Sequence, residues 1–115
     1  MSEATTSDLV TRHCAPCEGG VDPLGPEQAA AMLDAVPGWS LAAEGTEIER
    51  AFRFRNFHEV MEFVNGLAWI AHREDHHPDM QVGYSRVKVT YTTHAIGGLS
   101  ENDYICAARI NALLD

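Results

Sequence analysis

The sequence has no long apolar run, few basic residues and few cysteines. No stretch approaches the roughly 20 apolar residues that a membrane-spanning helix needs, and residues 1–8 lack the apolar segment of a secretory signal. Eight Lys and Arg stand against 17 Asp and Glu, a formal net charge of −9 that argues against general binding to nucleic acid or anionic membranes. Three cysteines, an odd number, are typical of a reducing compartment. We therefore expect a cytoplasmic protein with no nucleic-acid and no membrane partner.

The 115 residues, 45% of them hydrophobic, suffice for one domain with a modest core. Residues 1–25 show little periodicity and contain much Gly and Pro, which predicts a loosely ordered N-terminal arm. Residues 26–115 are predicted to form a single domain. Because the core is small, oligomerisation would be a natural way to bury more surface.

Hydrophobic periodicity predicts helices over residues 26–35, 57–75 and 101–114, and strands over residues 39–43, 47–55, 80–84 and 86–94. The order α-β-β-α-β-β-α predicts an α+β fold, in which a four-stranded antiparallel sheet has its helices packed on one face. The other face would be left for solvent or a second subunit. Spacings of three and four on the central helix predict this core-facing set: Phe57, Val60, Met61, Val64, Leu67, Ala68 and Ala71.

Four of the six histidines lie between positions 72 and 94. His76 and His77 follow the central helix, and Pro78 should force His77 out of helical geometry, so that the two imidazoles point in different directions. His94 ends the strand predicted over 86–94, on its polar face. Histidine titrates near neutrality, so such a group can supply a general acid and a general base. Solvated surface histidines are the plain alternative, and a metal site is another, because His72 and His76 are four apart on one helix face.

Three further features have competing interpretations. Cys14-x-x-Cys17 could hold a metal together with His13, but without a second pair it is more simply two reduced thiols. Trp39 can pack in the core or flank a ring-shaped ligand. Asp103 follows the N-cap Ser100 and is by default an acid in the first turn of a helix.

Several motifs together resemble the pterin-4a-carbinolamine dehydratases over nearly the whole chain. The histidine motif is His72-Arg73-Glu74-Asp75-His76-His77-Pro78-Asp79, and Thr93-His94-Ala95-Ile96-Gly97-Gly98-Leu99-Ser100-Glu101-Asn102-Asp103 follows it. Residues 14–20, Cys-Ala-Pro-Cys-Glu-Gly-Gly, and the turn Pro37-Gly38-Trp39 are similar to bacterial members. His72 departs from the family, which often has Glu at that position.

The resemblance implies dehydration of 4a-hydroxytetrahydrobiopterin to quinonoid dihydropterin, which recycles the cofactor of aromatic amino acid hydroxylases. It implies that His76, His77 and His94 are catalytic, that Asp103 lies near the ligand and that Trp39 flanks its ring. Asp75 and Pro78, on either side of the histidine pair, are expected to contact the substrate as well.

The resemblance also implies a homodimer or homotetramer, functional coupling to phenylalanine hydroxylase, and no metal or cofactor. Two other hypotheses stay open. One is a non-catalytic binding protein on the same fold, such as a RuBisCO assembly factor or a transcriptional coactivator. The other is a metal-binding regulator that uses Cys14, Cys17 and the histidines.

Overall fold

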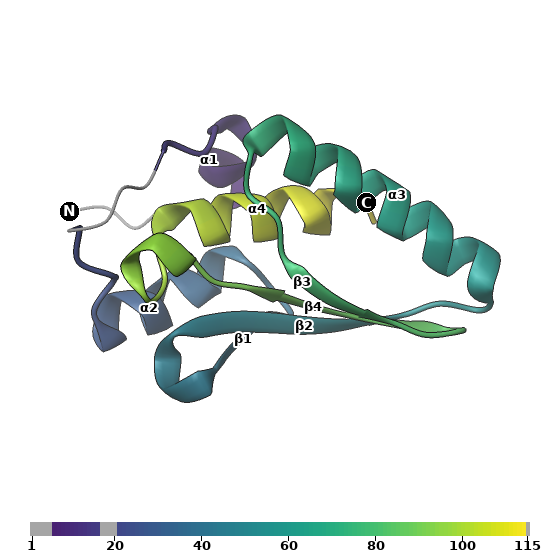
Figure 1. Cartoon of the computed structure of the whole chain (residues 1–115), viewed down its shortest axis with the longest axis horizontal. Helices are drawn as coiled ribbons and strands as arrows, with labels where there is room; N and C mark the ends of the chain where they lie inside the picture. The colour runs from purple at the N-terminus through teal and green to yellow at the C-terminus, as the bar shows by residue number, and fades with distance from the viewer. Residues whose placement is uncertain (1–5, 17–20, 115) are drawn as a thin grey trace.

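The structure is a computed structural model that describes residues 6–16 and 21–114 (Figure 1). Its elements follow the predicted order, with one additional helix before them. In chain order they are α1 (Thr6–Thr11), α2 (Pro26–Met32), β1 (Ser40–Ala42), β2 (Glu47–Arg53), α3 (Phe57–Glu74), β3 (Asp79–Val82), β4 (Arg86–Tyr91) and α4 (Glu101–Ala112), with short 3-10 turns at Leu33–Ala35, Ala43–Gly45 and His94–Ile96.

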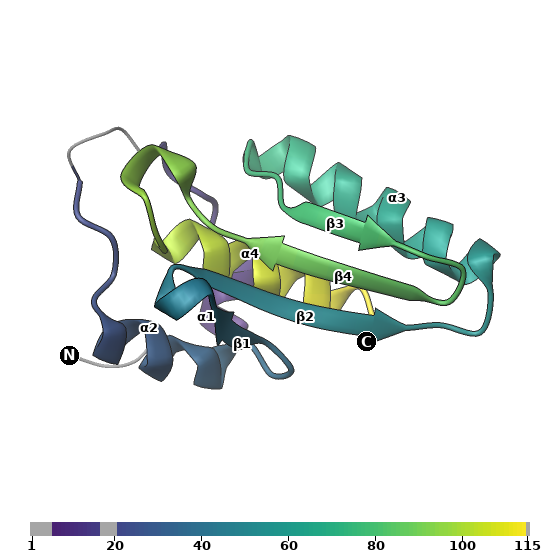
Figure 2. The same ribbon diagram turned by 60° about the horizontal axis from the view of Figure 1, so that its bottom comes forward.

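The four strands form one antiparallel sheet in the order β1-β2-β4-β3. Figure 2 shows that the two hairpins lie next to each other, with the long strands β2 and β4 in the centre. Their register runs from Ile48 opposite Tyr91 to Arg53 opposite Arg86. Both predicted hairpins and the predicted α+β fold class are therefore confirmed.

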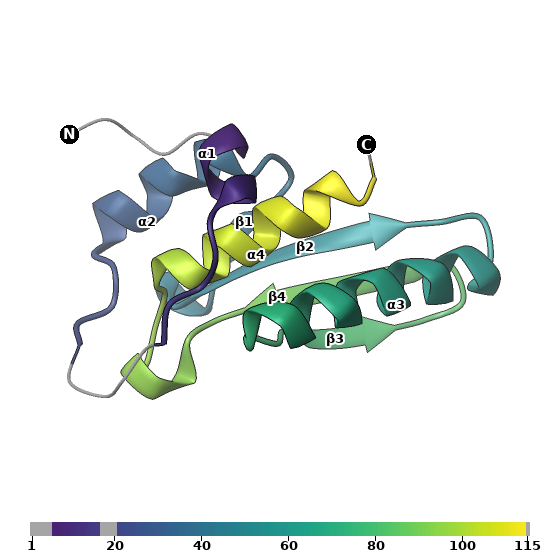
Figure 3. The same ribbon diagram turned by 90° about the horizontal axis from the view of Figure 1, so that it is seen from above.

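Helices α3 and α4 cover one face of the sheet, and α1 packs on α4 (Figures 1 and 3). Helix α2 contacts α4 through the Tyr104 hydroxyl, which donates a hydrogen bond of 2.7 Å to the Ala29 carbonyl. On the helix-facing side of the sheet, Ile48, Val89 and Tyr91 are fully buried. The opposite side is polar because period-2 alternation places residues such as Glu49, Lys88 and Thr90 there. No helix in the described residues is long and apolar enough to cross a membrane.

The apolar face of α3 differs from the prediction. The residues that α3 buries are Val60, Phe63, Leu67, Ile70 and Glu74, whereas Phe57 is 46% exposed and Ala68 is exposed. The helix has two apolar stripes at the same spacing, and only contact with the sheet decides between them. Of the predicted set, Val60 and Leu67 are buried and Met61 and Val64 are half-buried against the core, whereas Phe63 and Ile70 were not predicted.

The prediction of a loosely ordered arm is wrong for residues 6–16. Residues 6–11 form α1, whose Leu9 is completely buried in the core. Residues 12–16 run along the first turns of α4 and are held there by side-chain hydrogen bonds. One buried leucine and several backbone contacts are enough to order this segment, although its composition lacks a periodic signal. Residues 1–5 and 17–20 lie outside the described part of the chain.

Candidate active site

A cavity of about 370 Å³ opens where the end of α3 meets the beginning of α4. Four segments line it, namely residues 14–16, 74–77 and 93–95, and Asn102. All three histidines that the sequence predicts to be catalytic, His76, His77 and His94, are on its wall. The fold therefore brings His76 and His94, which are 18 positions apart in the sequence, to one cavity. The N-terminal residues 14–16 line the same cavity.

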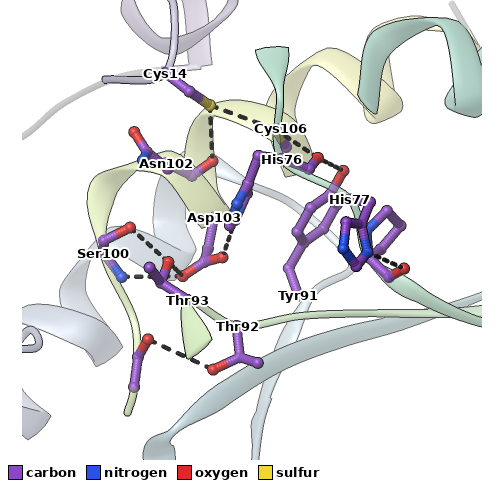
Figure 4. A network of polar contacts seen from close by, with 12 residues as sticks. Cys14, His76, His77, Tyr91, Thr92, Thr93, Ser100, Asn102, Asp103 and Cys106 are labelled. Carbon is purple, nitrogen blue, oxygen red and sulfur yellow. Dashed lines mark hydrogen bonds and ion pairs between the residues drawn. The ribbon is translucent and has the colours of Figure 1, made fainter. Parts of the chain in front are cut away.

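The end of α3 sets the position of the histidine pair. Asp75 adopts a left-handed conformation, with φ 52° and ψ 42°, and terminates the helix. The backbone N–H groups of Asp75 and His76 donate back to the carbonyls of His72 and Ala71 at 3.3 and 3.1 Å, a Schellman-type ending. His76 and His77 follow the end of the helix and point in different directions (Figure 4), which is what the presence of Pro78 led us to expect.

His76 is fixed by a buried carboxylate. Its Nε2 lies 2.6 Å from Oδ1 of Asp103, a residue with no solvent exposure (Figure 4). The second oxygen, Oδ2, accepts hydrogen bonds from the Thr93 hydroxyl and the Ser100 backbone N–H, both at 2.9 Å. The His76 ring also stacks on Tyr91, with 5.2 Å between ring centroids and 22° between the planes. The hydrogen bond to Asp103 therefore fixes the imidazole at one nitrogen, and the stacked Tyr91 ring supports one of its faces.

Asp103 also determines the protonation of His76. Burial is the largest single effect and disfavours the imidazolium, but the hydrogen bond and the negative charge of Asp103 together outweigh it, so the pKa of His76 is raised. Because Asp103 engages Nε2, the neutral ring carries its proton there. Nδ1 is then the nitrogen left to exchange a proton with a bound molecule.

His77 and His94 are both exposed and line the cavity from two different segments. Nδ1 of His77 lies 3.4 Å from the Pro78 carbonyl. The sequence predicted that His94 ends a strand, and this is wrong. Strand β4 stops at Tyr91, and His94 begins a 3-10 turn. Gly97 closes that turn with a positive φ of 70°, which a glycine adopts without strain.

Two of the four predicted substrate contacts border a hollow in the surface. Asp75 lines the cavity beside the histidines. Pro78 is buried and borders a neighbouring hollow between α3 and β3, which His72, His76 and His77 also line. His72 is thus beside the site but not in the cavity that holds all three predicted catalytic histidines.

The other two predicted contacts are behind the site. Trp39 is 5% exposed, donates a hydrogen bond from Nε1 to Asn111 Oδ1 at 2.9 Å, and packs against Phe52 and Tyr91. It is a core residue because Tyr91 occupies the space between it and His76. Asp103 is buried and saturated by protein donors, so it orients His76 and does not line the cavity.

Sequence reasoning missed three residues of the cavity wall: Cys14, Glu74 and Asn102. Glu74 and Asn102 looked like ordinary polar positions on helices, yet both are buried, at 8% exposure each. Cys14 was noticed only as part of a CxxC motif, and its Sγ lies 3.6 Å from Sγ of Cys106 on α4. Burial of a polar residue at a helix end is the property that marks Glu74 and Asn102 as residues of the site, and the sequence alone does not show burial.

The structure shows no candidate metal site in residues 6–16 and 21–114. No three His, Cys, Asp or Glu side chains there are arranged to hold an ion. His72 and His76 line the same hollow, but His76 turns its Nε2 to Asp103. Cys17, the other half of the CxxC motif, lies outside the described residues.

Comparison with known proteins identifies the family of this chain. A sequence model of the family described as Pterin 4 alpha carbinolamine dehydratase matches residues 22–113. The chain belongs to this dehydratase family. The resemblance drawn from the two histidine motifs is therefore confirmed.

Curated relatives of this dehydratase family extend over the N-terminal segment as well. A protein of Dechloromonas aromatica (strain RCB), named "Putative pterin-4-alpha-carbinolamine dehydratase", is 54% identical over 112 residues, 97% of this chain and 98% of its own. One of Nitrosomonas eutropha with the same name is 56% identical, over 93% of this chain and 94% of its own. A solved structure titled as a transcriptional coactivator/pterin dehydratase from Brucella melitensis superimposes with a TM-score of 0.78 at 32% identity, and covers 82% of this chain and 100% of its own.

Proposed function

We propose that this dehydratase-family chain converts pterin-4a-carbinolamine (4a-hydroxytetrahydrobiopterin) to quinonoid dihydropterin by histidine acid/base catalysis. The observation that carries the proposal is the oriented pair of His76 and Asp103 on a cavity that His77 and His94 also line. The family and its named relatives supply the substrate class.

The reaction needs two proton transfers and no electrons. The C4a–O bond breaks, and the hydroxyl leaves as water once an acid has protonated it. A ring nitrogen loses one proton to a base, and its electron pair forms the new double bond to C4a. The acid gives one proton to the leaving hydroxyl, and the base takes one proton from the ring nitrogen. The enzyme has therefore gained or lost no proton overall, and a proton transfer from the base to the acid restores its starting form.

We assign the base to His76 and the acid to His77 or His94. A carboxylate behind an imidazole stabilises the imidazolium that forms when the ring accepts a proton, and Asp103 stands in that position. The exposed rings of His77 and His94 can be recharged from solvent, which suits a proton donor. Side chains alone supply this chemistry, and we propose that no metal or cofactor is used. Treatment with a chelator should then leave the rate unchanged.

The test is to follow decay of the 4a-carbinolamine, generated by phenylalanine hydroxylase, after addition of the purified protein. We expect acceleration by the unaltered chain and a loss of about 10²- to 10⁴-fold in His76→Ala, the range for a positioned acid or base. His77→Ala and His94→Ala should each lose activity too. His58→Ala is the matched control, since His58 is exposed near the start of α3 and outside the cavity.

If all three cavity histidines could be replaced at wild-type rate, the site assignment would be wrong. If the unaltered chain gave no acceleration, a non-catalytic binding role would be favoured over the dehydratase. The printed title of the Brucella melitensis structure names a transcriptional coactivator beside the dehydratase, so such a role has a precedent on this fold.

We further propose that the chain works as a homodimer or homotetramer in the cytoplasm, coupled to an aromatic amino acid hydroxylase that supplies the substrate. The edge strand β3 supports association, because Met80 and Val82 on it are 37% and 45% exposed. Trp69 on the neighbouring α3 is 63% exposed. Sedimentation equilibrium of the full chain measures the assembly directly, and a monomer at micromolar concentration would contradict the proposal.

A further inference from the structure

The N-terminal segment of residues 12–16, here called the arm, forms one wall of the cavity. Cys14, Ala15 and Pro16 line the same cavity as His76, His77 and His94. The match to the family model begins only at residue 22. The arm therefore lies outside the region that defines the family, although it borders the site where the chemistry is proposed.

The end of α3 holds the arm through an ionised, buried glutamate. Glu74 accepts hydrogen bonds from the Cys14 backbone N–H at 2.7 Å and from His13 Nδ1 at 2.9 Å. Burial opposes ionisation, but these hydrogen bonds and the charge of Arg109 prevail and lower the pKa of Glu74. Glu74 precedes His76 by two residues, so the same helix end fixes the arm and the histidine pair.

The beginning of α4 holds the arm through an amide. Asn102 accepts from the Ala15 N–H at 3.0 Å and donates to the Ala15 carbonyl at 2.6 Å, so one side chain binds both backbone groups of one residue. Asp103, the next residue, binds His76. Figure 4 shows Asn102 and Asp103 together at the beginning of α4, with Cys14 above them. At the outer end of the arm, Arg12 pairs with Glu101 at 2.7 Å.

We propose that the arm is a substrate-binding wall of the active site, and that Asn102 and Glu74 are the positioning residues that keep it in place. This inference rests on the proposed function for the identity of the ligand, a pterin. The arm offers no acid or base to the cavity beyond the Cys14 thiol, whose pKa is raised by its hydrogen bond with the Cys106 sulfur and by partial burial. Its contribution is therefore to binding and not to proton transfer.

The expected signature is a change in KM with little change in kcat. Asn102→Ala removes both hydrogen bonds to Ala15, and loss of two neutral hydrogen bonds corresponds to roughly 30-fold weaker docking of the arm. Loss of a wall that binds substrate and transition state equally raises KM by up to that factor, as the undocked fraction grows, and leaves kcat within roughly twofold. Ala15→Pro removes the N–H donor from the arm side and leaves α4 unaltered. Asn65→Ala, an exposed amide on α3, is the matched control.

Two measurements decide the matter: steady-state kinetics with the 4a-carbinolamine, and the Kd of 7,8-dihydrobiopterin followed by fluorescence. Site-resolved alkylation of Cys14, read by peptide mass spectrometry, reports whether the arm has been released. The proposal predicts that KM and the Kd rise by up to roughly 30-fold in Asn102→Ala, which loses two hydrogen bonds, and by up to roughly fivefold in Ala15→Pro, which loses one. Both variants should speed alkylation of Cys14, and the control should do neither.

Faster alkylation of Cys14 with unchanged KM and Kd would overturn the inference, because the arm would then be released without consequence. A fall in kcat at constant KM would overturn it too, since it would place the arm in the chemistry. If the unaltered chain binds dihydrobiopterin without dehydrating the carbinolamine, the proposed reaction fails, and the Kd ratio alone decides about the arm. No binding of dihydrobiopterin by the unaltered chain would overturn both.

Discussion

Replacement of Asp103 by asparagine separates the two tasks of this carboxylate. Asparagine has nearly the same shape and keeps one oxygen, which can still accept from Thr93 and from the Ser100 N–H. The other position becomes an NH₂ group facing Nε2 of His76, where the carboxylate oxygen stood at 2.6 Å. The variant therefore keeps the cap of α4 and loses the acceptor that stabilises the imidazolium.

The size of the effect follows from that one contact. A hydrogen bond to a charged group contributes about 1.5–3 kcal/mol, and one pKa unit is about 1.36 kcal/mol. The pKa of His76 should therefore fall by roughly one to two units in Asp103→Asn. Burial, which already opposes the imidazolium, would then act without its counterweight. The neutral ring would also carry its proton on Nδ1, because Nε2 must now accept.

Titration of the His76 imidazole by NMR measures the shift directly. Because the wild-type pKa is raised in the folded state, the pair stabilises the fold fully below the unfolded pKa and loses that contribution as pH rises through the folded pKa. The stability deficit of the variant should therefore shrink on going from pH 6 to pH 9. The acid limb of kcat/KM should move to lower pH, with a reduced plateau.

Glu101→Gln is the control for the loss of one negative charge, since Glu101 lies on the same turn of α4 but is exposed and pairs with Arg12. A His76 pKa within about 0.3 units of wild type in Asp103→Asn would refute the reasoning, because one unit corresponds to only about 1.36 kcal/mol. It would mean that Asp103 does not govern the protonation of this ring.

Three other substitutions test the frame around the site. Gly38→Ala should destabilise the fold by about 1–3 kcal/mol, because Gly38 has φ +89°. Gly25→Ala is the control and should not destabilise it, because a Cβ added there meets no atom within 4 Å. Urea unfolding of the two variants measures the difference. Tyr91→Phe should cost about 0.5–1.5 kcal/mol in the same assay, because its buried hydroxyl donates to the His76 carbonyl. Glu74→Gln should be less stable than wild type at neutral pH, and the difference should vanish as pH falls through the lowered pKa of Glu74; a constant difference at all pH values would contradict its ionisation.

The parts of the fold that depend on local pattern could be predicted, and those that depend on a choice between equivalent faces could not. The hairpins and α3 were found because alternation and 3.6-residue periodicity are properties of the segment itself. Which stripe of α3 is buried depends on the sheet beneath it. Phe63 and Ile70 were therefore missed, although the ends of that helix were predicted to within one residue.

The same division applies to the site. His76 and His77 could be placed because Asp75 and Pro78 determine the chain direction locally. Trp39 could not, because its position relative to the cavity depends on which side of the Tyr91 ring it packs. The arm could not be foreseen either. Its ordering comes from its backbone groups, and the sequence of the arm does not show that two distant polar residues bind them.

The first turn of α4 connects these observations into one physical picture. Any helix start needs acceptors for its free N–H groups, and a carboxylate at the third position is an ordinary answer, as the capping box of Ser100 and Asp103 shows. Here the cap is buried, so Oδ1, the oxygen that does not cap the helix, would be unsatisfied without a donor, and His76 supplies one. A capping residue thus becomes the partner of a histidine at almost no additional structural cost. The sequence motif shows the cap alone, whereas the role of Asp103 at the histidine depends on α3 ending where it does. For that reason Asp103→Asn, which preserves the cap and alters only the histidine's partner, separates the two roles.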